Sequence, residues 1–146
     1  MRVAIYSDVH SNLEAFQAVL NDIDRQNVDQ KIFLGDIVGY GPSPNECVEL
    51  LRENSDVALG GNHDWAAVGL TDDSYFNQYA QESMKWTTGI LTDENKEYLK
   101  TLKPDQVLDN MHIVHSTPLE PPEWHYIMSI QDAQENYPML KKDVCF

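Results

Sequence analysis

Positively charged residues are scarce in this chain, which has 10 lysines and arginines against 24 aspartates and glutamates and a formal net charge of −14. A charge of this sign argues against non-specific binding to the phosphate backbone of nucleic acids or to an anionic membrane surface. High net charge ordinarily keeps a protein in solution. A more specific interpretation is that some of the carboxylates gather around bound cations.

Cysteines and long apolar runs are also few. Cys47 and Cys145 are far apart in the sequence, which excludes a disulfide framework and a CxxC metal knuckle. The N-terminal stretch MRVAIYSDVH has one arginine and an apolar run that stops at Asp8, too short for a signal peptide or a membrane span. We therefore expect a single domain over residues 1–146 in a reducing, cytoplasmic compartment, with no membrane partner and with nucleic acid disfavoured.

The first half of the chain alternates between strand and helix patterns. Continuous apolar runs typical of doubly covered strands occupy residues 2–8, 31–36 and 56–61. Helical spacing of apolar residues occupies the intervening residues 11–23 and 43–51. Each helical segment begins with an expected capping box, Ser11 with Glu14 and Ser43 with Glu46. The order β-α-β-α-β predicts a parallel sheet with right-handed crossovers.

The pattern changes after Asp64. Apolar spacing predicts one helix over residues 76–91 and a short one over 98–102 that Pro104 stops. MHIVHSTP (residues 111–118) predicts a fourth strand, SIQDAQENY (129–137) a helix, and DVCF (143–146) the start of another strand.

Polar side chains occur where the predicted strands end. They are Asp8 and His10, then Asp36, then Asn62 and His63, and finally His115. Because ligands of open α/β sheets bind outside the carboxyl ends of the strands, these groups should face one crevice. The pair Gly60-Gly61 should let the backbone turn so that Asn62 and His63 reach it. Such oxygen and nitrogen donors, without a thiolate, suit Mn²⁺, Fe or Zn²⁺.

Asp36 is central in the order of strand ends, and a carboxylate can bridge two cations. Two bridged cations suit the attack of hydroxide on phosphorus, since one ion lowers the pKa of water and both stabilise the charge of the in-line transition state. The residues by themselves therefore favour metal-dependent phosphoester chemistry.

Four segments taken together resemble the calcineurin-like metallophosphoesterases, in particular the bacterial branch of small phosphatases and phosphodiesterases. They are SDVHSN (residues 7–12), GDIVGYGPSPNECVELL (35–51), GGNHD (60–64) and VHSTP (114–118). The resemblance implies an α/β fold, a β-sandwich flanked by helices. It also implies hydrolysis of phosphomonoesters or phosphodiesters by a metal-bridged hydroxide, with a small phosphorylated molecule as substrate.

The resemblance also implies a role for each polar residue. One metal ion would be held by Asp8, His10 and Asp36, and the second by Asp36, Asn62 and His115. His63 would face the phosphate as a catalytic residue, and Asp64 would hold the His63 ring and raise its basicity. Two divalent ions are expected, with Mn²⁺ favoured over Fe, Zn²⁺, Co²⁺ and Ni²⁺. The substrate-binding residues are not identified.

The chain departs from the family pattern after Phe146, where the family continues into a Gly-His-x-His turn. We therefore expect a C-terminal truncation that leaves the second sheet incomplete and each metal shell short of one imidazole. An exposed sheet edge would favour a homodimer or oligomer. Of the other histidines, His112 should point to the opposite face from His115. His125 should lie on a loop, either near the cleft where it could face substrate or exposed on the plain surface.

Two alternatives remain. A truncated, catalytically impaired member of the family would act as a metal-binding or protein-interaction scaffold. An unrelated mononuclear metal or nucleotide-binding α/β domain would carry a glycine-rich phosphate loop after the first strand, whereas SDVHSN contains no glycine.

Overall fold

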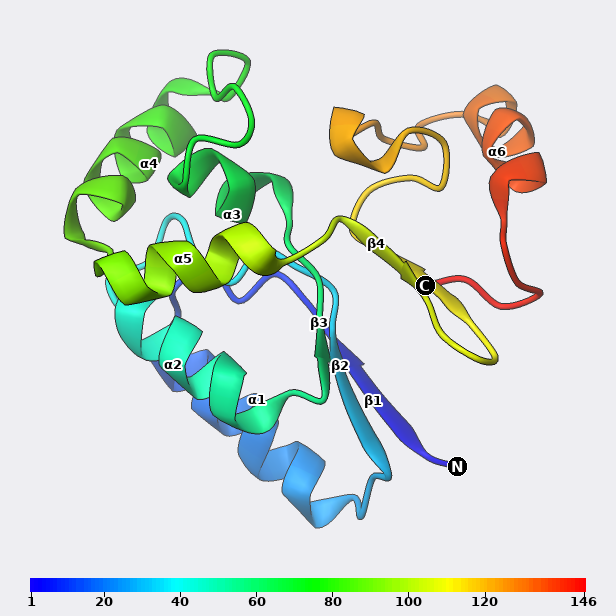
Figure 1. Ribbon diagram of the computed structural model, residues 1–146, viewed down its shortest axis with the longest axis horizontal. Coiled ribbons are helices and arrows are strands. Elements are labelled where there is room, and N and C mark those ends of the chain that lie inside the picture. Colours follow the sequence, from blue (N-terminus) through cyan, green and yellow to red (C-terminus); the bar gives the residue numbers. More distant parts are fainter.

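The computed structural model describes residues 1–146 and contains two small sheets (Figure 1). The first sheet, in the order β1-β2-β3, consists of β1 (Val3–Tyr6), β2 (Gln30–Phe33) and β3 (Val57–Ala58). Its strands are parallel, with Ile5 opposite Ile32. The predicted parallel sheet is confirmed, although β3 is much shorter than the expected strand over residues 56–61.

Helices α1 (Leu13–Arg25) and α2 (Pro44–Asn54) connect these strands in the two segments predicted to be helical. The N-cap of α1 is Asn12, whose side chain accepts a hydrogen bond from the Ala15 N–H at 3.1 Å. Ser11 does not cap the helix, because its N–H donates to the Ile37 carbonyl at 2.8 Å and its backbone is left-handed, with φ of 58°. The predicted Ser11 capping box is therefore wrong.

The second helix begins at the predicted place. Ser43 is its N-cap and Pro44 its first residue, but the Ser43 side chain makes no capping hydrogen bond. The expected capping box with Glu46 is therefore absent, while the position of the helix start is confirmed.

Three further helices follow β3: α3 (Asn62–Ala67), α4 (Gln78–Ile90) and α5 (Asp93–Thr101). The last two correspond to the predicted helices and are capped by the side chains of Asn77 and Thr92. Helix α3 is new, because the sequence pattern treats residues 62–64 as the end of a strand. The structure places them instead in the first turn of a short helix.

The second sheet is an antiparallel hairpin of β4 (Asp105–Val107) and β5 (His112–Val114). The strand predicted over residues 111–118 is thus present but shorter. Cys145 forms a parallel bridge with His112, in agreement with a strand beginning near residues 143–146. The remaining elements are η1 (Pro121–Glu123), α6 (Ile130–Asn136) and η2 (Tyr137–Met139), of which α6 confirms the helix predicted over 129–137.

The two faces of the first sheet pack against different partners. Phe33 belongs to the larger apolar cluster, which includes Phe16 of α1 and Leu51 of α2. Its neighbour Ile32 points to the other face and packs with Ile113 of the hairpin. Helices therefore cover one face and the second sheet covers the other, as a flanked β-sandwich requires (Figure 1). None of the helices combines the length and apolar character needed to cross a membrane.

Candidate metal centre

The loops after β1 and β2 are held side by side in an unusual backbone conformation. Asp8, His10 and Asp36 all have left-handed φ values, of 57°, 48° and 62°. Such values are uncommon outside glycine and persist only where the surroundings enforce them. The surroundings here are backbone hydrogen bonds between the loops: Asp8 N–H to Gly35 O and His10 N–H to Asp36 O, each 3.0 Å. The strained turns aim three metal-binding side chains at one point.

Asp8, His10 and Asp36 form a group whose ligand atoms all lie within 4.8 Å of one another. The His10 Nε2 atom is 3.8 Å from Asp8 Oδ1 and 3.7 Å from Asp36 Oδ2. On the other side of the ring, Nδ1 donates to the Val38 carbonyl at 3.0 Å. That bond fixes the ring so that Nε2 faces the carboxylates, the arrangement found behind metal-binding histidines.

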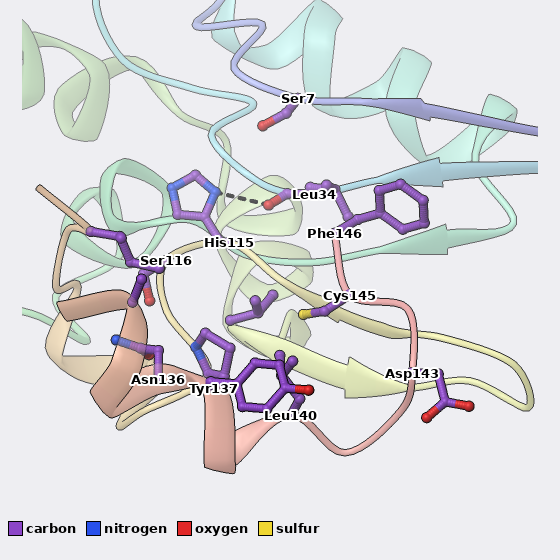
Figure 2. Close-up of a pocket in the computed structure, with 14 residues that line it drawn as sticks. Ser7, Leu34, His115, Ser116, Asn136, Tyr137, Leu140, Asp143, Cys145 and Phe146 are labelled. Carbon is purple, nitrogen blue, oxygen red and sulfur yellow. Dashed lines mark hydrogen bonds between the residues drawn. The ribbon is translucent and has the colours of Figure 1, made fainter. Parts of the chain in front are cut away.

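A second group shares Asp36 with the first. The His115 Nε2 atom lies 3.5 Å from Asp36 Oδ2 and 3.2 Å from Asn62 Oδ1. The His115 Nδ1 atom donates to the Leu34 carbonyl at 2.8 Å, the dashed bond of Figure 2. Both histidines are therefore held in the same way, by a backbone carbonyl of the segment that follows β2.

The electrostatics of the second group show that it attracts positive charge. Burial lowers the pKa of His115, but the hydrogen bond and charge of Asp36 outweigh burial and raise that pKa to about 9. Burial likewise raises the pKa of Asp36, and its histidine neighbours reverse the effect and lower it. The raised pKa shows that Asp36 favours positive charge on His115. A metal ion bound there would supply that charge in place of the proton, because imidazole binds metals in its deprotonated form.

The donors suit two divalent ions. They are oxygen and nitrogen atoms only, from Asp8, His10, Asp36, Asn62 and His115. Asp36 is buried between the two groups, and its Oδ1 atom accepts the His63 N–H at 3.0 Å. Mn²⁺, Fe and Zn²⁺ all accept such ligands, so the donor set does not select among them. The structure brings the five predicted ligands together, and their individual roles as ligands remain predictions.

Asp64 has a different role from the predicted one. Its fully buried carboxylate accepts four backbone N–H groups at 2.8–3.0 Å, from Gly61, Asp36, Ile37 and Val38. It makes no hydrogen bond to His63, whose Nδ1 atom is buried without a partner. Burial and the charge of Asp36 raise the pKa of Asp64, and the backbone N–H groups counteract this by stabilising the carboxylate. The predicted orientation of the His63 ring by Asp64 is therefore wrong.

Aromatic packing positions His63 instead. Ring centroids of Phe76, His10 and Tyr40 lie 4.6, 4.8 and 4.9 Å from that of His63. Burial lowers the pKa of His63, which keeps the ring neutral near pH 7. The sequence did not lead us to expect that Phe76 or Tyr40 would position His63. For Tyr40, the signal was its place in the GDIVGYGP segment, beside the Asp36 ligand.

The glycines of the site are needed for close approach. A Cβ atom on Gly61 would lie 2.1 Å from Asp36 Oδ1, and one on Gly39 would lie 2.7 Å from His63 Nδ1. The sequence predicts Gly60-Gly61 as a hinge, yet Gly61 has an ordinary φ of −95°. Gly61 is required here because the backbone passes directly against the shared carboxylate.

Two cavities adjoin His115. The larger, of about 620 Å³, lies between the ends of β1 and β2 and the C-terminal segment, and its lining includes Ser7, Tyr137 and Phe146 (Figure 2). The smaller, of about 190 Å³, lies under the turn at residues 124–127 and is also lined by Asn62.

The two remaining histidines lie outside the donor groups. His112 is buried in β5, and its Nε2 atom is 3.1 Å from Asp105 Oδ2. His125 is half exposed, with Nε2 at 3.7 Å from Glu120 Oε2. His112 therefore points away from the site, as expected. His125 lies on an exposed loop that also lines the smaller cavity beside His115, in agreement with the expected loop position near the cleft.

The fold and the paired donor groups define a metallophosphoesterase, and residues 1–142 match the model of the calcineurin-like phosphoesterase family. The chain belongs to this family. It is 42% identical to a metallophosphoesterase from Sphaerobacter thermophilus, whose crystal structure it matches with a TM-score of 0.84 over 100% of this chain and 59% of that one.

Two archaeal proteins are also similar. An uncharacterized protein of Methanocaldococcus jannaschii is 41% identical over 130 residues, which are 86% of this chain and 53% of the relative. A hypothetical protein from Pyrococcus horikoshii shares the fold, with a TM-score of 0.71 at 24% identity over 82% of this chain and 56% of that one. The chain thus spans little more than half the length of these relatives.

Proposed function

We propose that this chain carries the metal centre of a dinuclear phosphoesterase that hydrolyses phosphomonoesters or phosphodiesters. The observation that carries the proposal is the pair of donor groups that share the buried Asp36 carboxylate. When bound, two divalent ions at such a site activate water as a nucleophile and neutralise charge on the phosphoryl group. Membership of the phosphoesterase family supports the reaction class.

We assign a separate role in the reaction to each group of site residues. Asp8, Asp36, Asn62 Oδ1 and the Nε2 atoms of His10 and His115 would hold the ions. His63 would face the phosphate. As a neutral imidazole it would stabilise the transition state through a hydrogen bond from its ring N–H, and as an imidazolium it would protonate the leaving oxygen. Asp64 acts through the backbone: it holds the turn from Asp36 to Val38 against Gly61 and so places the shared carboxylate.

The finer features of the proposal are a small phosphorylated substrate, Mn²⁺ as the favoured ion, a cytoplasmic location and a homodimer or oligomer. The donor chemistry supports Mn²⁺ without selecting it, and the acidic surface supports a substrate other than nucleic acid.

A catalytically impaired scaffold is the second candidate, and the hydrogen bonds of Asp64 are compatible with it. An aspartate that oriented His63 would indicate selection for catalysis. The observed aspartate organises backbone loops instead, which a metal-binding scaffold also needs. Turnover therefore has to be measured rather than inferred from Asp64.

The test is metal content by elemental analysis after Mn²⁺ loading, paired with hydrolysis of bis-p-nitrophenyl phosphate. We expect about two ions per chain with turnover, and we expect Asp36→Asn to lose both, since both donor groups share this carboxylate. Asp22→Asn, at an exposed position of α1, is the matched control. Bound metal without turnover would support the scaffold, and unchanged metal content in Asp36→Asn would defeat the shared role of Asp36.

A further inference from the structure

The smaller cavity lies directly beside the second donor group. Asn62 and His115 line it together with Ser116 and residues 124–127. None of these seven residues is acidic, although the chain carries 24 aspartates and glutamates. A cavity without a carboxylate, next to a site for phosphate, is compatible with an anionic ester.

Trp124 forms a rigid wall of this cavity. Its side chain is buried, and its indole N–H donates to Thr71 Oγ1 at 3.1 Å. Its ring meets that of Trp65 edge to face at 5.3 Å and that of His115 at 6.0 Å. The left-handed backbone at Trp124, with φ of 56°, turns the next residues back over the donor group.

The loop that carries Trp124 is tied to the rest of the molecule. Ser116 Oγ donates to the Pro121 carbonyl at 2.8 Å, and the Leu119 N–H donates to Asn136 Oδ1 of α6 at 2.9 Å. Thr117 is buried, and its hydroxyl donates to the Leu119 carbonyl at 2.9 Å. These bonds hold the cavity in shape before any ligand binds, which lowers the entropic cost of binding.

The lining selects a flat apolar group. Trp124, Tyr126 and the His125 imidazole supply ring surfaces, and Tyr126 is 75% exposed, so its ring is available to cover a ligand. Aromatic pairs gain from stacked or edge-to-face geometry beyond the area that they bury. A cavity of about 150 Å³ is large enough for benzene, so the 190 Å³ found here holds a single ring.

The larger cavity is a poorer site for this group. It is also lined by His115, but Asn62 does not reach it, and its lining includes the Asp143 carboxylate. Of these two cavities, the smaller one is lined by two of the proposed ligands, so an organic group there would extend directly from a phosphate held by the second donor group.

We propose that the cavity under Trp124 binds the alcohol part of the phosphoester and selects a planar aromatic ring, with Tyr126 as the residue that determines this specificity. The inference rests on the proposed function, because it needs a phosphate at the paired donor groups.

The experiment compares kcat/KM of the Mn²⁺-loaded chain for benzyl, cyclohexylmethyl and ethyl phosphates, whose alcohols have similar acidity. We expect benzyl phosphate to exceed cyclohexylmethyl phosphate by roughly two- to tenfold. Tyr126→Ala should bring that ratio close to one, and Tyr126→Phe should keep it. Tyr137→Ala is the matched control, since Tyr137 is similarly exposed and lines the larger cavity but not the smaller one.

A second readout needs no turnover. In calorimetric titrations, benzylphosphonate should bind the Mn²⁺-loaded chain more tightly than cyclohexylmethylphosphonate, and Tyr126→Ala should remove the difference. Equal affinities and rates for the two rings, or a preference that survives Tyr126→Ala, would overturn the inference. Failure of the wild-type chain to hydrolyse any of the three esters would overturn the proposed enzyme instead, and the phosphonate titrations would then decide the inference alone.

Discussion

At the scale of single residues, Gly61 shows how closely the backbone approaches the shared ligand. In Gly61→Ala the new Cβ atom would meet Asp36 Oδ1 at 2.1 Å and the Asp36 nitrogen at 2.7 Å. We expect Asp36 to move, with loss of Mn²⁺ measured by elemental analysis and a lower melting temperature. Gly89→Ala is the control: it lies in α4 with nothing within 4 Å. Alanine there should stabilise the helix by about 0.5 kcal/mol. Equal metal content in both variants would contradict the close-approach argument.

Substitutions at the neighbouring residues His63 and Asp64 should have different effects, one on turnover and the other on stability. Asp64→Asn replaces a carboxylate oxygen with an NH₂ group that faces backbone N–H donors, so we expect a loss of roughly 2 to 4 kcal/mol in unfolding free energy. His63→Ala should keep its metal and lose roughly 10²- to 10⁴-fold in turnover. Urea denaturation and steady-state kinetics measure the two effects. An Asp64→Asn variant of normal stability with the kinetic defect of His63→Ala would restore the orienting role that the structure argues against.

At the scale of elements, the start of α1 gives a matched pair of substitutions. Asn12→Ala removes the hydrogen bond that caps the helix and should lower the unfolding free energy by about 1 kcal/mol. Ser11→Ala removes a buried hydroxyl that has no partner, so it should be neutral or slightly stabilising. Chemical denaturation of both variants measures the difference. A larger loss for Ser11→Ala than for Asn12→Ala would mean that Ser11 is the cap after all.

The same scale shows what the sequence could predict. The strands β1 and β2 and the helices α1, α2, α4 and α5 follow from apolar spacing, because each buries one face or both. Helix α3 does not, since contacts between Asp64 and distant backbone groups determine its place. The ligand positions were predictable because strand ends converge. The wall formed by Trp124 was not, because it depends on a left-handed turn and on Thr71, far away in the sequence.

At the scale of the whole molecule, labelling of the two cysteines should distinguish global unfolding from local opening of the second sheet. Cys47 is fully buried in the larger apolar cluster, where burial raises its pKa to about 12. Cys145 is partly exposed at the edge of the second sheet, and burial raises its pKa as well. Proteins open locally at free energies well below that of global unfolding. Cys145 should therefore be labelled on the order of 100-fold faster than Cys47 by a thiol reagent at pH 8.

Metal binding provides a second test of whether Cys47 is exposed only by global unfolding and Cys145 by local opening. Mn²⁺ that binds only the native state raises the free energy of global unfolding, so it should slow labelling of Cys47. Its effect on Cys145 should be smaller, because the three backbone hydrogen bonds that join residues 144–146 to β5 can open without separating the donor groups. The variants Cys47→Ser and Cys145→Ser isolate the two thiols for mass spectrometry. Equal labelling rates would mean that the two layers of the sandwich open together. Slowing of Cys145 alone would mean that the metal stabilises the second sheet rather than the helical layer.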